Sequence, residues 1–254
     1  MFDPSRPSLA ARLNARDTLG IAWLATGSLP VAEAATGFDA VVLDLQHGLW
    51  DRATTEAAVG VLSSRTPVLL RVADSGSACI GAALDSGAEG VIVPLVETAQ
   101  QAANALSAAR FPPHGIRSAG GCRPLADLGA YLSWCTSHLF VAVMIETAVG
   151  VAAADEIAAV PGIDMVFIGS GDLSLSLGTA PSDPETLAAC DRVLDACAAS
   201  SVPCGIFTSD PQTARLMRAR GFSMVVLASD VALIHAGFVQ ARRIWDQPEG
   251  KDAT

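Results

Sequence analysis

Short apolar segments rich in Val and Ile alternate with longer Ala-rich segments along most of this 254-residue chain. The apolar segments lie at 20–24, 40–43, 68–71, 90–94, 139–145, 165–168, 202–207 and 222–227. Between most of them, Asp, Glu and Arg recur at helical spacing, as in 51–64, 77–86, 98–110, 152–160, 184–200 and 210–220. Continuous apolar strands separated by helices are typical of a parallel sheet covered by helices. Eight repeats in this length favour a closed (β/α)8 barrel, or TIM barrel, over an open doubly wound sheet, so we predict an α/β fold with one barrel domain over residues 1–254.

The segment boundaries carry residues that start and stop helices. Asp183-Pro184 and Asp210-Pro211 predict helix starts, because an Asp oxygen can cap and Pro is tolerated in the first turn. Gly87 and Gly221 predict helix ends. The stretch 111–124, FPPHGIRSAGGCRP, is too rich in Gly and Pro for a helix and is predicted to be a loop.

Composition excludes several classes of protein. The formal net charge of −10 argues against a nucleic-acid or anionic-lipid partner. No apolar run reaches the ~18 residues of a membrane helix, and the first residues lack the apolar stretch of a signal peptide. The six cysteines are scattered without a CxxC pair, so we expect buried, reduced thiols in a cytoplasmic protein.

Polar residues follow the predicted strands where a barrel of this kind forms its active site. They are Asp44, His47, Arg71, Glu146 and Asp172. Active sites of (β/α)8 barrels lie at the carboxyl ends of the strands, so these side chains should converge on one rim. This convergence is the strongest functional indication in the residues themselves.

Four of the five rim residues have both a structural and a functional interpretation. His47 is a hydrogen-bonding residue of the rim or a general base. Arg71 forms a salt bridge or clamps a carboxylate or an enolate oxygen. Glu146 and Asp172 form unrelated ion pairs, or together they bind a hard cation, Mg2+ or Mn2+. The backbone of Gly169-Ser170-Gly171 offers N–H groups suited to an anion.

Five motifs in order resemble the HpcH/HpaI aldolase family over roughly residues 18 to 230. They are VLDLQHG at 42–48, GAEGVIVP at 87–94, PPHGIR at 112–117, IET at 145–147 and FIGSGDLS at 167–174. The resemblance implies a metal-dependent class II pyruvate aldolase that acts on a small 2-oxo acid and an aldehyde. Typical members are 4-hydroxy-2-oxoheptanedioate aldolase and 2-dehydro-3-deoxyglucarate aldolase.

The resemblance also implies catalytic roles for three residues. His47 would be the base. Asp85, supplied by a neighbouring subunit, would be the acidic partner that raises its basicity. Arg71 would bind the 2-oxo oxygen and stabilise the enolate.

Binding roles follow in the same way. Glu146 and Asp172 would hold the divalent metal, which would be Mg2+, Mn2+ or Co2+. The backbone at Gly171 and Asp172, in the turn that includes Ser170, would bind the pyruvyl carboxylate, and Trp23 would line the site. The last helix would pack on a neighbouring subunit, in trimers that pair as hexamers.

The chain departs from the family pattern at two positions and leaves the reaction open. Gln46 stands where several members carry Glu, and Met144 stands where several carry a substrate-binding Gln. Lys251 is the only lysine, which argues against imine chemistry. Two alternatives stay open: condensation or decarboxylation of oxaloacetate or another 2-oxo acid, with or without metal, and a non-catalytic 2-oxo acid binding protein.

Overall fold

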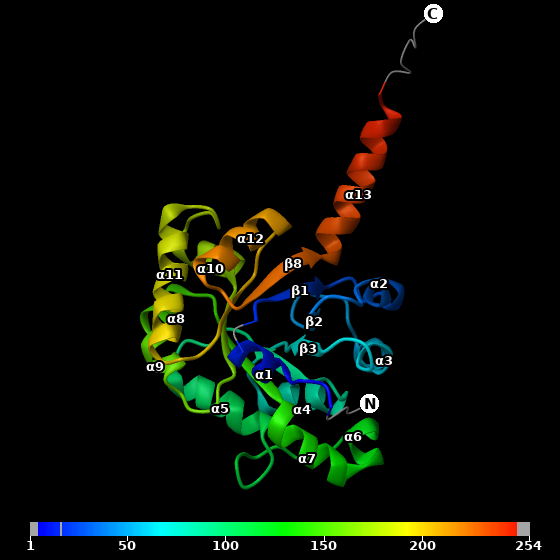
Figure 1. Ribbon diagram of the computed structural model, residues 1–254, viewed down its shortest axis with the longest axis vertical. Coiled ribbons are helices and arrows are strands. Elements are labelled where there is room, and N and C mark those ends of the chain that lie inside the picture. The colour runs from blue at the N-terminus through cyan, green and yellow to red at the C-terminus, as the bar shows by residue number, and fades with distance from the viewer. Residues whose placement is uncertain (1–4, 16, 248–254) are drawn as a thin grey trace, which may run out of the picture.

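Eight parallel strands close into one barrel in chain order, and helices surround it (Figure 1). The computed structural model describes residues 5–15 and 17–247. The strands are β1 Leu19–Leu24, β2 Ala40–Asp44, β3 Val68–Arg71, β4 Gly90–Val93, β5 Phe140–Ile145, β6 Met165–Ile168, β7 Cys204–Ile206 and β8 Met224–Ser229. β8 pairs with β1, with Leu19 opposite Met224, and this closes the barrel. The predicted (β/α)8 fold is confirmed.

Helices fill the connections between strands. Those that match predicted segments are α3 Arg52–Leu62, α4 Ser77–Asp85, α5 Ala99–Ala109, α11 Pro184–Ala199 and α12 Pro211–Arg220. The predicted helix at 152–160 is instead two short helices, α8 Ala148–Ala152 and α9 Ala154–Ala158. The others are α1 Leu9–Asn14, α2 Leu29–Ala34, α6 Cys122–Ala126, α7 Leu128–His138, α10 Ser170–Leu177 and α13 Asp230–Trp245.

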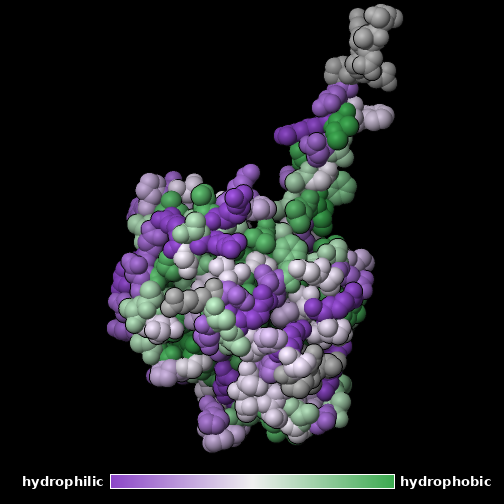
Figure 2. Space-filling model, viewed as in Figure 1, coloured by the Kyte–Doolittle hydropathy of each residue, from purple (hydrophilic) through white to green (hydrophobic). Residues whose placement is uncertain are grey.

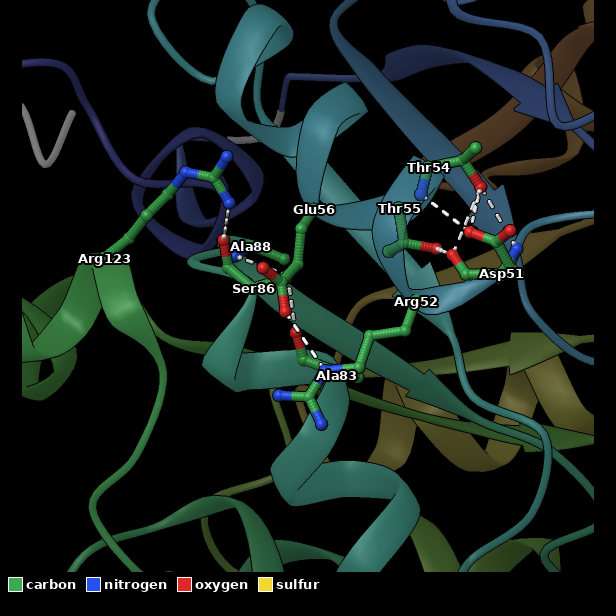
Figure 3. A network of polar contacts seen from close by, with 9 residues as sticks. All are labelled: Asp51, Arg52, Thr54, Thr55, Glu56, Ala83, Ser86, Ala88 and Arg123. Atoms are coloured by element: carbon green, nitrogen blue, oxygen red, sulfur yellow. Dashed lines mark hydrogen bonds and ion pairs between the residues drawn. The ribbon is translucent and has the colours of Figure 1, made fainter.

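Side-chain caps fix where helices begin next to the carboxyl ends of the strands. Asp51 accepts a hydrogen bond from the backbone N–H of Thr54 at 2.7 Å, and the Thr54 hydroxyl receives one in return from Asp51 N at 3.1 Å. This capping box starts α3, and α4 lies beside it with Ser86 at its end (Figure 3). Such a cap stabilises a helix because it satisfies backbone N–H groups that have no partner inside the first turn. The Asp210 side chain caps α12, as the sequence predicted, by accepting hydrogen bonds from the backbone N–H groups of Gln212 and Thr213.

The interior of the barrel is filled with side chains and is closed at its amino end by α1. Leu9 and Leu13 of α1 are buried in the same cluster as the inward-facing residues of the strands, which include Trp23 and Phe167. Below them, the Arg6 guanidinium binds the buried Glu89 carboxylate at 2.6 Å. The cavity that carries the polar rim residues is therefore at the opposite, carboxyl end.

Two further sequence predictions need correction. The stretch 111–124 is not a loop throughout, because its last three residues begin α6, and α7 follows before β5. Gly121, with φ of 87°, precedes α6, so the glycines end the loop and do not exclude a helix after it. The six thiols are free, but Cys122 is exposed and Cys79 only half-buried, so the expectation of burial is wrong for these two.

The last helix, α13, projects away from the barrel (Figure 1). Asp230 at its start is buried and accepts hydrogen bonds from the backbone N–H groups of Ala25 and Thr26, both at 2.9 Å. Beyond it, large apolar side chains are exposed, including Phe238 at 74% and Trp245 at 81%. Figure 2 shows hydrophobic residues gathered along this projection. Within residues 5–15 and 17–247, no helix combines the length and apolar character needed to cross a bilayer.

Candidate active site

A cavity of about 520 Å³ opens at the carboxyl ends of the strands. Its walls contain all five polar residues that the sequence placed on one rim: Asp44, His47, Arg71, Glu146 and Asp172. They come from the ends of β2, β3 and β5 and from the first turn of α10. The structure therefore brings together side chains that lie up to 128 positions apart in the sequence, as the numbering of Asp44 and Asp172 shows.

The guanidinium of Arg71 is fixed by Asp44. Nε donates to Oδ1 at 2.8 Å and Nη2 donates to Oδ2 at 2.6 Å, a two-point contact between two buried side chains. β2 and β3 place the two residues opposite each other in register. Burial by itself would raise the pKa of Asp44, but the hydrogen bonds and charge of Arg71, together with the His47 backbone N–H, hold it below its ordinary value. The pair is therefore ionised at neutral pH, and the Arg71 plane has a set orientation.

Trp23 supports this ion pair from β1. Its indole N–H donates to Asp44 Oδ2 at 3.3 Å, and Arg71 Cζ lies 5.0 Å from the centre of its ring. The ring also contacts Phe167 and Phe207, with centroids 5.8 and 5.4 Å away. Trp23 thus forms an aromatic wall that keeps Asp44 and Arg71 in place and excludes water from one side of them.

Glu146 and Asp172 are the two carboxyls of the opposite wall. Glu146 Oε1 accepts a hydrogen bond from the Leu95 N–H at 2.8 Å, while Oε2 is buried without a hydrogen-bond partner among the described residues. Burial, opposed by the Leu95 N–H and reinforced by the neighbouring Asp172, raises the pKa of Glu146 to about 7. A buried carboxyl oxygen without a donor, next to a second carboxyl, suits a bound cation.

The backbone at the end of β6 makes room for Glu146. A Cβ added at Gly169 would lie 2.4 Å from Glu146 Oε2 and 3.2 Å from Met144 Sδ. Glycine is therefore required at this position for close approach. Within residues 5–15 and 17–247, no cluster of three or more His, Cys, Asp or Glu forms a protein-only metal site, so water or substrate would complete the shell of a cation there.

The remaining predicted residues occupy different places. His47 is exposed at the cavity, and its backbone N–H donates to Asp44 Oδ1 at 3.2 Å. Gly171 lines the cavity near the start of α10. The Ser170 hydroxyl donates to the Phe207 carbonyl at 2.8 Å, and Ser170 is not among the cavity walls. Its side chain is thus used within the fold, which leaves only its backbone to face a ligand.

Asp85 lies outside this cavity in its own chain. It ends α4, which runs back from the carboxyl end of β3, so it sits near the amino end of the barrel, five residues before β4 begins. Arg117, which is buried, donates to Asp85 Oδ1 at 3.2 Å. One chain alone therefore does not bring Asp85 to His47.

Two contributors to the site were not recognised as such from the sequence. Asp44 was placed on the rim but received no role, although it is the anchor of Arg71. Leu95, with a left-handed φ of 56°, aims its N–H at Glu146. Asp44 was visible as the first polar residue after an apolar strand; a leucine that acts through its backbone leaves no such signal.

The barrel and its rim define a class of protein: a (β/α)8 enzyme whose cavity pairs one fixed arginine with two carboxyls suited to a cation. The family model of "HpcH/HpaI aldolase/citrate lyase" matches residues 24–236, and the chain belongs to this family. The resemblance inferred from the five motifs is thereby confirmed.

Named relatives extend this comparison. The chain is 35% identical to a hydroxypyruvate/pyruvate aldolase of Chromohalobacter salexigens, over 84% of this chain and 87% of that protein. It is 34% identical to a 4-hydroxy-2-oxovalerate aldolase of Rhodococcus jostii, over 92% of this chain and 93% of that protein. A crystal structure of a family member from Burkholderia cenocepacia superposes with a TM-score of 0.88 at 31% identity, covering 94% and 99% of the two chains. These relatives support a lyase of the aldolase type.

Proposed function

We propose that the protein is a divalent-metal-dependent aldolase that cleaves or forms 4-hydroxy-2-oxo acids through the enolate of pyruvate. The observation that carries the proposal is the unpartnered, buried Oε2 of Glu146 beside Asp172, because both residues line a cavity that also contains Arg71. A Mg2+, Mn2+ or Co2+ ion held by these two carboxylates would supply Lewis-acid polarisation of the 2-oxo acid.

Arg71 is proposed to bind the 2-oxo oxygen. A guanidinium has five N–H donors, and Asp44 engages Nε and Nη2. Among the described residues Nη1 has no acceptor, so it is free to donate to a substrate oxygen. Because the guanidinium does not need to reorient, it stabilises the negative charge that develops on that oxygen in the enolate.

The start of α10 is proposed to hold the carboxylate of the 2-oxo acid. The first N–H groups of a helix have no partner inside the helix, and they favour an anion. Gly171 and Asp172 present these groups at the cavity, and the absence of a side chain at Gly171 lets a ligand approach the backbone closely. This contact would fix the substrate with its 2-oxo oxygen toward Arg71.

His47 is proposed to accept the proton of the 4-hydroxyl group in the cleavage direction. As that proton leaves, the C3–C4 bond breaks, an aldehyde departs, and the electron pair of the bond becomes the pyruvate enolate. Protonation at C3 then yields pyruvate. Asp85 of a neighbouring subunit would hydrogen-bond to the other ring nitrogen and increase the basicity of His47. Imine chemistry is not proposed, because the only lysine, Lys251, lies near the chain end and outside the described residues.

A second candidate is a condensation or decarboxylation of a 2-oxo acid such as oxaloacetate. This candidate is supported by the family description, which includes citrate lyase beside aldolase. The same Arg71 and carboxyls would stabilise the enolate in either reaction. A non-catalytic 2-oxo acid binding protein is disfavoured, because binding alone does not need an exposed base at His47.

Pyruvate release from a panel of 4-hydroxy-2-oxo acids tests the proposal. We expect release with Mg2+, Mn2+ or Co2+ and none after EDTA treatment, with recovery when metal is returned. Asp172→Ala should abolish activity without unfolding the protein, while Asp183→Ala, outside the cavity, should retain it. Full activity in protein that metal analysis finds empty would refute metal dependence. Decarboxylation of oxaloacetate with no aldol cleavage would instead favour the second candidate.

A further inference from the structure

Within one chain, the charged groups of the cavity leave no permanent cation for a second anion. Among the described residues that line it, the acidic side chains are Asp44, Glu146 and Asp172, and the basic ones are Arg71 and the titratable His47. Arg71 is already neutralised by Asp44 at 2.6 Å. An anionic group on the aldehyde half of the substrate would thus enter a cavity in which Arg71, the permanent cation among the described lining residues, is already paired with Asp44.

The exposure of the lining residues separates the floor of the cavity from its mouth. Arg71, Met144 and Glu146 are buried and form the floor, where the 2-oxo acid is proposed to bind. Leu175 is 75% exposed, and Pro181 is exposed as well, which places both at the mouth.

The side wall between floor and mouth consists of the half-buried Ala25, Phe207 and Ser229 and the buried Ser174, and these four side chains are uncharged. His47, which is exposed, and Asp172 also line the cavity. The Ser174 hydroxyl donates to the Gly171 carbonyl at 2.7 Å, so it is not free to donate to a carboxylate. Among the described residues, the only side-chain hydroxyl of this wall that has no hydrogen-bond partner is that of Ser229, and it suits a neutral hydroxyl or carbonyl better than an ion.

From this wall we infer that the aldehyde released or accepted by the enzyme is uncharged. The inference rests on the proposed aldolase function and specifies its substrate class: 4-hydroxy-2-oxo acids whose only anionic group is the 1-carboxylate. Aldehydes that end in a carboxylate, phosphate or sulfonate are disfavoured, because their charge loses water at an apolar wall without gaining an ion pair. Small alkyl and hydroxyalkyl aldehydes fit.

The test compares two acceptors of the same shape in condensation with pyruvate. Succinic semialdehyde ends in a carboxylate, and 4-methylpentanal replaces that carboxylate with an isopropyl group. We expect kcat/KM to be at least about tenfold higher for 4-methylpentanal, the scale of discrimination that an unpaired polar group produces. Exchange of the methyl protons of pyruvate with solvent, measured without any aldehyde, reports whether the enolate forms at all.

A variant with a cation at the mouth makes the test more specific. Leu175→Arg should lower the ratio of the two kcat/KM values by about threefold to fivefold, the range expected for a solvent-exposed ion pair. Leu216→Arg adds the same charge on α12 at a site that is 64% exposed and outside the cavity, and it should leave the ratio unchanged. An equal fall in both variants would mean that overall charge, not the mouth, sets the preference, and would contradict the inference.

The two failures are distinguishable. If pyruvate protons do not exchange, the proposed function fails and the inference fails with it. If they exchange and succinic semialdehyde is used as well as or better than 4-methylpentanal, the aldolase function stands and the inference alone is wrong; a neighbouring copy of the chain would then supply the missing cation.

Discussion

The guanidinium of Arg71 and the carboxylate of Asp44 face each other from paired positions on β3 and β2, joined by contacts of 2.8 and 2.6 Å. Trp23 covers the pair from β1. The relationship explains how a charged side chain at the end of an apolar strand is tolerated: its charge is balanced before any substrate arrives. It also fixes which guanidinium nitrogen remains available to a ligand.

Replacing Asp44 tests this arrangement in the absence of substrate. Asp44→Asn should lower the free energy of unfolding by about 1.5–3 kcal/mol at pH 7, the range for hydrogen bonds to charged groups. The folded-state pKa of Asp44 is depressed, so its stabilising effect is present above the unfolded pKa near 3.8 and is lost as the pH falls through the lower folded value. The difference in free energy of unfolding between the wild-type protein and Asp44→Asn, measured with urea, should thus be smaller below pH 4 than at pH 7.

A matched variant controls for loss of a surface charge. Asp155 pairs with Arg192 in solvent, and Asp155→Asn should change the unfolding midpoint little. If Asp44→Asn behaves like Asp155→Asn, the buried pair does not stabilise the fold.

Arg71→Lys keeps the charge at the cavity floor but loses the planar two-point contact with Asp44. We expect turnover to fall by ~100- to 1000-fold, as for loss of an oxyanion donor, and exchange of pyruvate methyl protons to slow with it. Arg110→Lys, at an ion pair with Asp164 outside the cavity, serves as the control. Near-normal proton exchange in Arg71→Lys would remove Arg71 from the enolate role.

Glu146 should make the stability of metal-free protein depend on pH. Its pKa is raised to about 7 in the folded state, so folding is penalised above that pH, and the penalty disappears below the unfolded value near 4.5. The full penalty is about 3 kcal/mol, from roughly 1.4 kcal/mol per pKa unit. Glu146→Gln should therefore unfold at higher urea than the parent at pH 8.5 and at similar urea at pH 4.5, both with EDTA. Identical curves for the two proteins at pH 8.5 would show that Glu146 is not desolvated.

The sequence predicted the barrel well, because strand position depends on local apolar runs. The run at 165–168 is β6 as it stands, and β2 extends the run at 40–43 by one residue, Asp44. It predicted the rim for the same reason, because a polar residue that directly follows a buried strand must lie at the carboxyl end of the barrel. The helices α6 and α7 were missed, because the glycines and prolines of 111–124 indicated a loop and the segment after them was not interpreted as a helix.

Side-chain pairing could not be predicted from one sequence. Whether Arg71 meets Asp44 depends on the register of β2 against β3, which no local pattern specifies. The Ser170 hydroxyl turns to the Phe207 carbonyl because β7 ends beside β6, another relationship between distant segments. The position of Asp85 at the amino end of the barrel follows from the direction of α4, and its proposed role needs a second chain.

The exposed apolar residues of α13 predict self-association. A lone helix in water does not retain a face with Phe238 at 74% and Trp245 at 81% exposure unless it meets another surface. We expect light scattering to give a trimer or hexamer, and Phe238→Asp with Trp245→Asp to shift it to smaller species. Leu216→Asp, on α12, is the control. An active wild-type monomer at low concentration would contradict both this assembly and a shared site.

The proposed sharing of Asp85 between subunits predicts recovery of activity from two inactive proteins. His47→Ala should lose ~100- to 10,000-fold in turnover, the usual span for a general base, and Asp85→Ala somewhat less. If Asp85 reaches His47 only from a neighbouring copy, then unfolding and refolding the two variants together creates some sites with both residues intact. Random pairing makes about a quarter of the sites complete.

The control for this experiment is a mixture of the His47→Ala protein with the Arg71→Lys protein. His47 and Arg71 line the same cavity of a single chain, so every site in this mixture lacks one of the two residues, whichever chains assemble. Activity that recovers in the first mixture and not in the second would support a shared site. When His47→Ala and Asp85→Ala are combined in the same chain, the loss of turnover should be little greater than for His47→Ala alone, because the base and its partner act as a unit. Losses that multiply in the double variant, with no recovery on mixing, would mean that Asp85 serves only to pair with Arg117 within its own chain.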